Sequence, residues 1–357
     1  MDLKVFGWDD YFQAQFDKLR DDKYNLVCGR AISVEKGLYT LITENGTVNA
    51  KLSGSFLYKN REKVNYPCIG DWIVFKNSEN AETHTVYSVL KRKTCLKRKV
   101  KGNKTEQQLI AANVDLVFIV MGATYDFNLR KLERFMVQVK KSGATPIIVL
   151  NKIDLCDDYD EKIKEIEKLA DDVTTIVTST IDGRGVQVLR EHICPGKTAI
   201  FFGSSGVGKS SLINSIQEEK VVLTKEIGIK TQKGRHTTTW RETVILPNGG
   251  ILIDNPGIRE VQLWSDDDDL NAFFSDIAEL AVSCQYNDCT HTNEPGCMVL
   301  QSIESGSLDP ERLENYRRMK REVINLNKRK KQKEKKSNSK KNDYRRNNRK
   351  IKPEKYI

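Results

Sequence analysis

Apolar positions change pattern along the chain, and the first pattern is that of short strands. Between residues 24 and 99, β-rich runs alternate with turn residues, and 44–47 has a hairpin-type turn sequence. Four or five short strands in about 75 residues favour a small barrel such as an OB-fold over a small β-sandwich. Residues 1 to about 22 are polar and predict a short helix or arm.

The middle of the chain has continuous apolar runs, which are typical of strands buried on both faces. These runs occupy residues 115–120, 146–150, 175–177 and 199–202. Helix-like segments at 129–141 and 161–170 separate them, which predicts a parallel sheet with helices on both sides. A hairpin is expected at 243–253. Beyond about residue 264 the pattern becomes helical, and Pro310 is placed to open a long helix.

Charge is concentrated at one end of the chain. Residues 328–357 contain 15 Lys/Arg and three Asp/Glu, whereas the other 327 residues contain 44 and 46. This composition predicts a basic tail that is disordered when free and either contacts RNA phosphates or is merely solvated. The segment 95–104 is also basic and poor in apolar residues, which predicts a linker.

The composition, 38% hydrophobic and 30% charged, is that of a soluble globular protein without a membrane partner. The N-terminus lacks a basic region followed by an apolar run, so a cytoplasmic location is expected. Eight cysteines are too few for a disulfide scaffold and are expected to be thiols or metal ligands. No feature requires an oligomer, and a monomer is expected.

A phosphate-binding loop is predicted at residues 203–210, Gly-Ser-Ser-Gly-Val-Gly-Lys-Ser, between an apolar strand and a predicted helix. Its glycines let backbone N–H groups converge on phosphate oxygens, and the helix N-terminus adds its dipole. Lys209 is expected to reach the β- and γ-phosphates, and the Ser210 hydroxyl to bind Mg²⁺. This strand–loop–helix context disfavours a merely flexible loop. The expected phosphate contacts are Gly203, Ser204, Ser205, Gly206, Val207, Gly208, Lys209, Ser210 and Ser211.

A guanine site is predicted directly after the buried strand at 146–150, ahead of the phosphate loop in the sequence. The expected base-binding residues are Asn151, Lys152, Ile153, Asp154, Thr178, Ser179 and Thr180. The Asp154 carboxylate can accept from N1–H and the 2-amino group of guanine, a donor pair that adenine lacks. Lys152 can lie along the base, and Asn151 can tie this loop to the phosphate loop. N-K-x-D alone is more often a plain turn, but beside a phosphate-binding loop it indicates guanine.

Three further residues are candidates for sensing the γ-phosphate. Asp254 ends a predicted strand and is suited to the Mg²⁺ shell, while Gly257 can offer its N–H to the γ-phosphate. In the triplet 237–239 a Thr hydroxyl, Thr238 before Thr237, is expected to complete Mg²⁺ coordination only when the γ-phosphate is present. By itself the triplet would be interpreted as a β-rich turn.

A metal site is predicted from four residues with nitrogen or sulfur ligands within 14 positions: Cys284, Cys289, His291 and Cys297. This set suits a closed, tetrahedral, structural Zn²⁺ site, one per chain, and the alternative is four unpaired side chains.

The nucleotide elements occur in rotated order, with the base-binding motif ahead of the phosphate loop. Together with Ala-Ala-Asn-Val-Asp at 111–115, Gly-Arg-His-Thr-Thr-Thr at 234–239 and the Cys/His cluster, this order resembles the ribosome-small-subunit-dependent GTPase A family of bacteria. The resemblance extends over about residues 24–325. It implies an arm and OB-fold that bind RNA at 1–99, a circularly permuted GTPase domain at 100–262 and a mostly helical zinc-binding domain at 263–327. The tail, 328–357, exceeds the family pattern.

The resemblance also implies a function, the hydrolysis of GTP to GDP and phosphate while bound to the small ribosomal subunit and its rRNA during late maturation. Ile258 follows D-x-x-G where signalling GTPases have Gln, so slow intrinsic hydrolysis is expected, stimulated by the subunit. His236 is implied to position water; otherwise it is a solvated loop histidine. The alternatives are a nucleotide-gated RNA-binding protein whose hydrolysis is incidental, and a P-loop ATPase or kinase.

Overall fold

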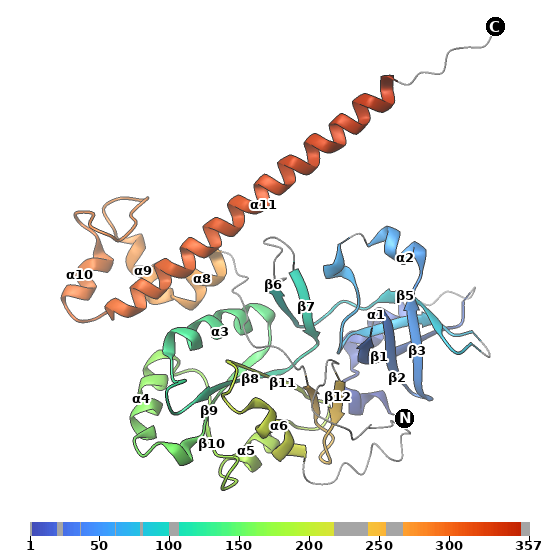
Figure 1. Cartoon of the computed structure of the whole chain (residues 1–357), viewed down its shortest axis with the longest axis horizontal. Coiled ribbons are helices and arrows are strands. Elements are labelled where there is room, and N and C mark those ends of the chain that lie inside the picture. Colours follow the sequence, from blue (N-terminus) through green and yellow to red (C-terminus); the bar gives the residue numbers. More distant parts are fainter. Residues whose placement is uncertain are drawn as a thin grey trace. The chain divides into compact units, whose positions relative to one another are not determined.

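The computed structural model describes residues 2–19, 24–35, 37–60, 62–78, 81–99, 107–217, 242–254 and 267–350. The chain forms two compact units (Figure 1). The first consists of residues 1–98 and 107–262, and the second of residues 99–106 and 263–357. None of the described helices is long and apolar enough to cross a membrane.

The first unit begins with a five-stranded barrel. Its strands are β1 (Leu26–Glu35), β2 (Leu38–Thr43), β3 (Gly46–Leu52), β4 (Trp72–Lys76) and β5 (His84–Val89). They pair in the order β1-β2-β3-β5-β4, and β4 pairs back to β1, which closes the barrel. Only β3 and β5 are parallel. The predicted OB-type barrel is therefore confirmed, with α2 (Gly54–Lys59) and the short helix η2 (Lys63–Asn65) between β3 and β4.

The N-terminal arm covers one end of this barrel with aromatic side chains. It contains the short helix η1 (Leu3–Phe6) and α1 (Asp10–Asp17), whose first turn is capped by the Asp9 carboxylate. Trp8 and Phe12 pack on Trp72 of β4, with ring centroids 4.7 and 5.8 Å apart. The arm therefore extends the barrel core.

The segment after the barrel corrects one prediction. Residues 95–104 were expected to be a linker, but Cys95–Lys99 forms strand β6, which pairs with β7 (Gln107–Ala112). The strand forms because Leu96 is fully buried and because the Gln138 side chain donates a hydrogen bond to the carbonyl of Lys97. These long-range contacts outweigh the basic composition of the segment.

The central sheet continues the first unit. Its strands are β8 (Leu116–Gly122), β9 (Thr145–Asn151), β10 (Thr175–Thr178), β11 (Thr198–Gly203), β12 (Glu242–Ile245) and β13 (Ile251–Asp254). The order is β10-β9-β8-β11-β13-β12, all parallel except β12. Ser33 of β1 faces Glu242 of β12, so barrel and central sheet share one hydrogen-bonded sheet of 11 strands.

Helices pack on both faces of the central sheet, as predicted. They are α3 (Leu129–Ser142), α4 (Tyr159–Leu169), α5 (Val186–His192) and α6 (Lys209–Gln217), with the short helix η3 (Ile153–Leu155) after β9. Phe201 and Phe202 are neighbours in β11 and therefore point to opposite faces. Phe201 is in one apolar cluster with Leu189 of α5 and Leu212 of α6, whereas Phe202 contacts Phe135 of α3.

The second unit is helical. It contains α8 (Asp267–Phe273), α9 (Ser275–Val282), α10 (Met298–Glu304) and α11 (Pro310–Lys350). Phe274 and Tyr316 form its centre, with ring centroids 5.4 Å apart. Arg312 lies over Phe274 and pairs with Asp276 at 2.6 Å, which holds α11 against α9.

The structure differs from the prediction at the basic tail. Residues 328–350 continue α11, although a tail without regular structure was expected. The segment 311–350 contains no Gly or Pro and many Lys, Arg, Glu and Gln residues, which have high helix propensity. The high charge of this segment predicted disorder, but its residues also favour a helix. Helix α11 begins inside the packed unit and continues into the segment.

Candidate nucleotide site and metal centre

The predicted nucleotide motifs meet at one edge of the central sheet. Because β8, β9, β10, β11 and β13 are parallel, their carboxyl ends lie along the same edge. The base-binding motif follows β9, the phosphate loop follows β11, Thr178 ends β10 and Asp254 ends β13. This is the edge at which open α/β sheets bind their ligands.

The phosphate loop has a backbone that only glycine adopts easily. Gly203, Gly206 and Gly208 have φ values of 148, 86 and 98°. A Cβ atom on Gly208 would lie 2.2 Å from Nδ2 of Asn151, and one on Gly203 would lie 2.3 Å from the carbonyl oxygen of Val120. The loop can therefore lie directly against β8 and the base-binding motif only with glycine at these positions.

Lys209 opens α6 and folds back over the phosphate loop. Its Nζ donates to the carbonyl oxygen of Gly203 at 2.8 Å and to that of Ser204. The side chain is only partly buried, and these two acceptors are neutral carbonyls. A phosphate is a stronger acceptor for an ammonium group than a carbonyl, so these contacts are exchangeable.

Asn151 joins the base-binding motif to the phosphate loop, as predicted. Its side chain is buried, and Nδ2 donates to the carbonyl oxygen of Val207 at 2.9 Å. Its Oδ1 accepts from the Thr178 hydroxyl at 3.0 Å. Lys152 has a φ of 65° and donates from Nζ to the carbonyl oxygen of Gly206 at 2.6 Å. One asparagine thus fixes the relative positions of three loops.

The loop after β10 contains the predicted Ser179 and, beyond it, Asp182, Arg184 and Gly185, which the sequence analysis missed. The buried Ser179 accepts at Oγ from the backbone N–H of Ile181 at 3.2 Å. Asp182 accepts from Nε of Arg184 at 2.8 Å, and this hydrogen bond lowers the pKa of Asp182 to about 2. Gly185 has a φ of 71°, and a Cβ there would meet the carbonyl oxygen of Val177 at 1.9 Å. The Asp-Gly-Arg-Gly sequence at 182–185 was the available signal for this turn.

Several candidates from the sequence lie outside the described residues. These are His236, Thr237, Thr238, Gly257 and Ile258. Asp254 is the last described residue of its segment, and Asp154 lies half-buried in η3 beside Lys152.

The predicted metal ligands converge in the second unit. The ligand atoms of Cys284, Cys289, His291 and Cys297 all lie within 4.8 Å of one another. Nδ1 of His291 is 3.6 Å from Sγ of Cys284 and 3.5 Å from Sγ of Cys297, and those two sulfurs are 3.9 Å apart. Ligands about 2.3 Å (S) and 2.0 Å (N) from a tetrahedral zinc are separated by roughly 3.5–3.8 Å. The cluster therefore fits a metal ion.

The backbone around the cluster is held by one carboxylate. Glu294 accepts from the backbone N–H groups of Thr290 at 2.9 Å and Thr292 at 2.7 Å. Its hydrogen bond with the Thr290 hydroxyl, followed by that with the Thr290 N–H, keeps the pKa of Glu294 well below its usual range. The ionised Glu294 therefore holds the loop that carries Cys289 and His291, which has a φ of 59°.

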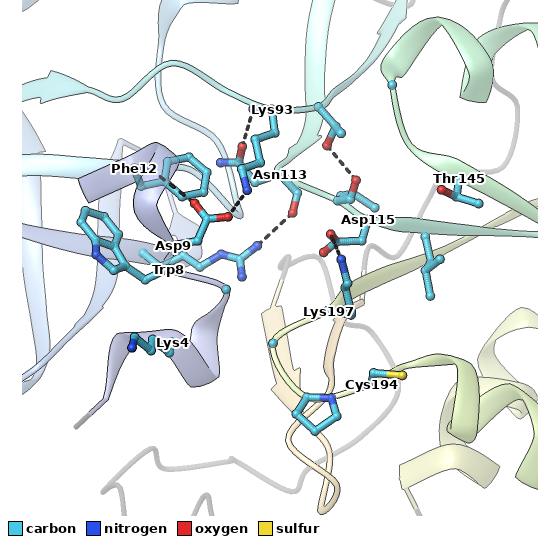
Figure 2. A pocket seen from close by; sticks show the side chains of 18 of the residues that line it. Lys4, Trp8, Asp9, Phe12, Lys93, Asn113, Asp115, Thr145, Cys194 and Lys197 are labelled. Carbon is cyan, nitrogen blue, oxygen red and sulfur yellow. Dashed lines mark hydrogen bonds and ion pairs between the residues drawn. The ribbon is translucent and has the colours of Figure 1, made fainter. Parts of the chain in front are cut away.

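A cavity of about 480 Å³ lies at the opposite edge of the sheet from the nucleotide motifs, where the barrel meets β8 and β11 (Figure 2). Figure 2 shows Lys93 reaching Asp9 and Lys197 reaching Asp115 on its walls. Arg30 of β1 is 3% exposed in its wall.

The contacts of Arg30 join the barrel to the central sheet. Arg30 donates to the carbonyl oxygens of Phe6, Gly70 and Asn113 and, at 2.8 Å, to the Thr198 hydroxyl. Asn113 in turn donates from Nδ2 to Gly70 at 3.0 Å. The Ala-Ala-Asn-Val-Asp segment at 111–115 therefore forms the joint between barrel and sheet, a role that its sequence did not reveal.

The sheet order, the glycine-rich loop under a lysine and the base-binding motif ahead of it define a P-loop GTPase of circularly permuted order. Comparison with known proteins agrees. A family model described as RsgA GTPase matches residues 89–264, and one described as 50S ribosome-binding GTPase matches 198–336. The chain belongs to the RsgA GTPase family.

Two relatives illustrate this membership. A "Small ribosomal subunit biogenesis GTPase RsgA" of Methanosarcina acetivorans is 41% identical over 317 residues, which cover 89% of this chain and 84% of the relative. A "Small ribosomal subunit biogenesis GTPase RsgA 1" of Bacteroides thetaiotaomicron is 38% identical over 338 residues, covering 93% and 94% of the two chains.

Solved structures share the fold. The crystal structure of YjeQ from Thermotoga maritima superimposes with a TM-score of 0.61 at 27% identity, covering 84% of this chain and 99% of the other. YloQ, described as a circularly permuted GTPase, gives a TM-score of 0.59 at 24% identity, covering 86% and 98%.

Proposed function

We propose that this chain hydrolyses GTP to GDP and phosphate while bound to the small ribosomal subunit, and that it assists late maturation of the subunit in the cytoplasm. The proposal that the chain binds a nucleotide rests on two hydrogen bonds. The side chains of Asn151 and Lys152 donate to the backbone carbonyls of Val207 and Gly206. These contacts hold the base-binding motif directly against the phosphate loop, as a site for one guanine nucleotide would require. The ribosomal part is supported by the relatives, which are small ribosomal subunit biogenesis GTPases.

The nucleotide would be bound by residues with separate roles. Asp154 would read the guanine edge, with Lys152 along the base and the segment 178–180 supplying an N–H to the guanine carbonyl. Lys209 would exchange the carbonyls of Gly203 and Ser204 for β- and γ-phosphate oxygens. The other phosphate contacts would come from the backbone of residues 203–211.

Hydrolysis would depend on Mg²⁺ and on the γ-phosphate sensors. Ser210 and Thr238 would ligate Mg²⁺, Asp254 would support its shell, and Gly257 would donate to the γ-phosphate. His236 would position the attacking water once the small subunit orders its loop. Without that partner, Ile258 leaves the water unoriented, so turnover would be slow.

The other domains would hold the partner. We place the RNA-binding arm and barrel at 1–99, the GTPase domain at 100–262, the zinc-binding helical domain at 263–327 and the basic segment at 328–357. A barrel groove of about 980 Å³ supports RNA contact, because Lys76 lies 3.4 Å from the ring centroid of Tyr24 and Tyr87 is beside it. The Cys₃His cluster would hold one Zn²⁺, which joins the loop 284–297 into a fixed unit.

Phosphate release from GTP and from ATP, each with and without purified small subunits, tests this proposal. Slow GTP turnover that the subunit accelerates strongly, with little turnover of ATP, is expected. Equal turnover with and without subunits would remove the ribosomal activator. If subunits bound in a GTP-dependent way while His236→Ala left turnover on them unchanged, a nucleotide-gated RNA-binding protein would be the better description.

A further inference from the structure

A groove of about 630 Å³ separates the metal loop from one face of α11. The loop contributes residues 287–292, and α11 contributes Glu314, Arg317, Lys320, Arg321 and Ile324. Three cations thus lie on the helix face opposite the cluster. Arg321 is held by Glu314 at 3.1 Å, and Lys320 donates to the Tyr316 hydroxyl at 3.2 Å.

Arg317 differs from these neighbours because its donors are not used. Its Nε and Nη2 atoms are buried and have no hydrogen-bond partner among the described residues. Its only ion pair there is a long one, 3.8 Å from Nη1 to Glu314. Burying guanidinium donors without acceptors costs free energy, so an acceptor with negative charge is expected close by.

With its metal bound, the cluster would supply that negative charge. Three cysteine thiolates and a divalent ion leave a net charge of −1, which the neutral imidazole of His291 does not change. Cys289 and His291 line the same groove as Arg317 and Lys320, so both cations face the cluster.

We propose that Arg317 is a positioning residue of the metal centre: its guanidinium balances the charge of the Cys₃His–zinc cluster, and metal binding thereby fastens the loop 284–297 to α11. The inference rests on the proposed zinc. It makes metal affinity depend on a helix that contributes no ligand.

The test compares zinc affinity in three variants of the full-length chain. Arg317→Met removes both charge and donors, Arg317→Lys restores the charge, and Arg318→Met is the matched control on the exposed neighbour. Competition with a chromogenic chelator measures the affinity. Loss of an outer contact of a metal site lowers affinity roughly 10- to 100-fold, so Arg317→Met is expected in that range and Arg318→Met at the wild-type value. Arg317→Lys is expected in between.

Cobalt substitution supplies a readout that a merely structural role would not move. Loss of a positive charge beside the sulfurs is expected to shift the thiolate-to-cobalt charge-transfer band of Arg317→Met to lower energy, because the thiolates become easier to oxidise. Arg318→Met should leave the band in place. Unchanged affinity and spectrum in Arg317→Met, with helical circular dichroism retained, would overturn the proposal, and weaker binding of ribosomal RNA by that variant would then assign Arg317 to an RNA phosphate. A wild-type chain without zinc would instead defeat the proposed metal itself.

Discussion

The two edges of the central sheet both place a cation on backbone carbonyls, yet one edge is a joint and the other a binding site. At the amino edge, Arg30 is 3% exposed and all its acceptors belong to the protein interior. At the carboxyl edge, Lys152 and Lys209 reach equivalent acceptors from partly exposed positions. A hydrogen bond from a cation to a backbone carbonyl is therefore a fixed part of the fold at the buried amino edge. At the partly exposed carboxyl edge, a phosphate oxygen can replace the carbonyl as the acceptor.

Burial also lowers the pKa of Arg30 without removing its charge. Desolvation lowers the pKa of Arg30 to about 10, and the nearby carboxylates of Asp115 and Asp71 raise it in opposition. Arg30 therefore stays charged at neutral pH. Asp71 is itself committed to Arg92 at 2.7 Å, so the joint depends mainly on neutral oxygens.

The largest effect is expected on the free energy of unfolding when Arg30 is replaced. Arg30→Met removes the donor to the carbonyls of Phe6 and Asn113 and one of two side-chain donors to the carbonyl of Gly70. It also removes the donor to the Thr198 hydroxyl, and the free energy of unfolding should fall by about 3–5 kcal/mol. Urea unfolding of the nucleotide-free chain measures it. The control is Arg98→Met, because Arg98 is only partly buried and its hydrogen bonds among the described residues are exposed ones to the Gln108 side chain. Equal losses in the two variants would show that the joint is no stronger than a surface contact.

Replacing Lys209 should lower GTP turnover and leave the stability of the fold nearly unchanged, the reverse of the effect at Arg30. Lys209→Met removes a phosphate contact but only exchangeable bonds of the protein, so GTP turnover should fall about 100-fold, or about 2.7 kcal/mol in the barrier. Its urea midpoint should stay near that of the wild type. Lys197→Met at the amino edge should keep full turnover. Full stability loss in Lys209→Met would mean that the lysine is structural.

Asp154 sharpens the comparison by testing base selection alone. Asp154→Asn keeps the shape of η3 but cannot accept from both guanine donors, so the preference for GTP over ATP should drop about 30-fold, or about 2 kcal/mol. Competition binding with the two nucleotides measures this ratio. Asp157→Asn, a nearby exposed carboxylate, is the control. An unchanged ratio would place base selection elsewhere.

The smallest effect is expected at Asp182. Its pKa is lowered to about 2 in the folded chain, against about 3.9 when unfolded, so it contributes stability above pH 4 that is lost as the pH falls toward 2. The pair with Arg184 is exposed to solvent, so Asp182→Asn should lower the melting temperature only slightly at pH 7. The two melting temperatures should converge near pH 2. A gap that persists there would exclude the carboxylate charge as its cause.

The motifs were predictable because their chemistry is local in sequence. Lys209 and Asn151 lie in short segments whose spacing encodes the contact, and the structure confirms the tie between their loops. Arg30 carries no such signal, since its partners come from distant segments of the sequence. Strand β6 was missed for the same reason, because burial of Leu96 depends on β7.

The pairing of Ser33 with Glu242 has a mechanical consequence. Eleven strands joined edge to edge behave as one elastic body, so a pull on the barrel strains β12 through backbone bonds. In sequence, β12 is preceded by the segment with Thr238 and followed, after one hairpin, by Asp254. A load applied to the barrel would therefore reach the carboxyl edge of the sheet through the main chain, and a substitution that keeps the backbone N–H, unlike proline, would leave that path intact.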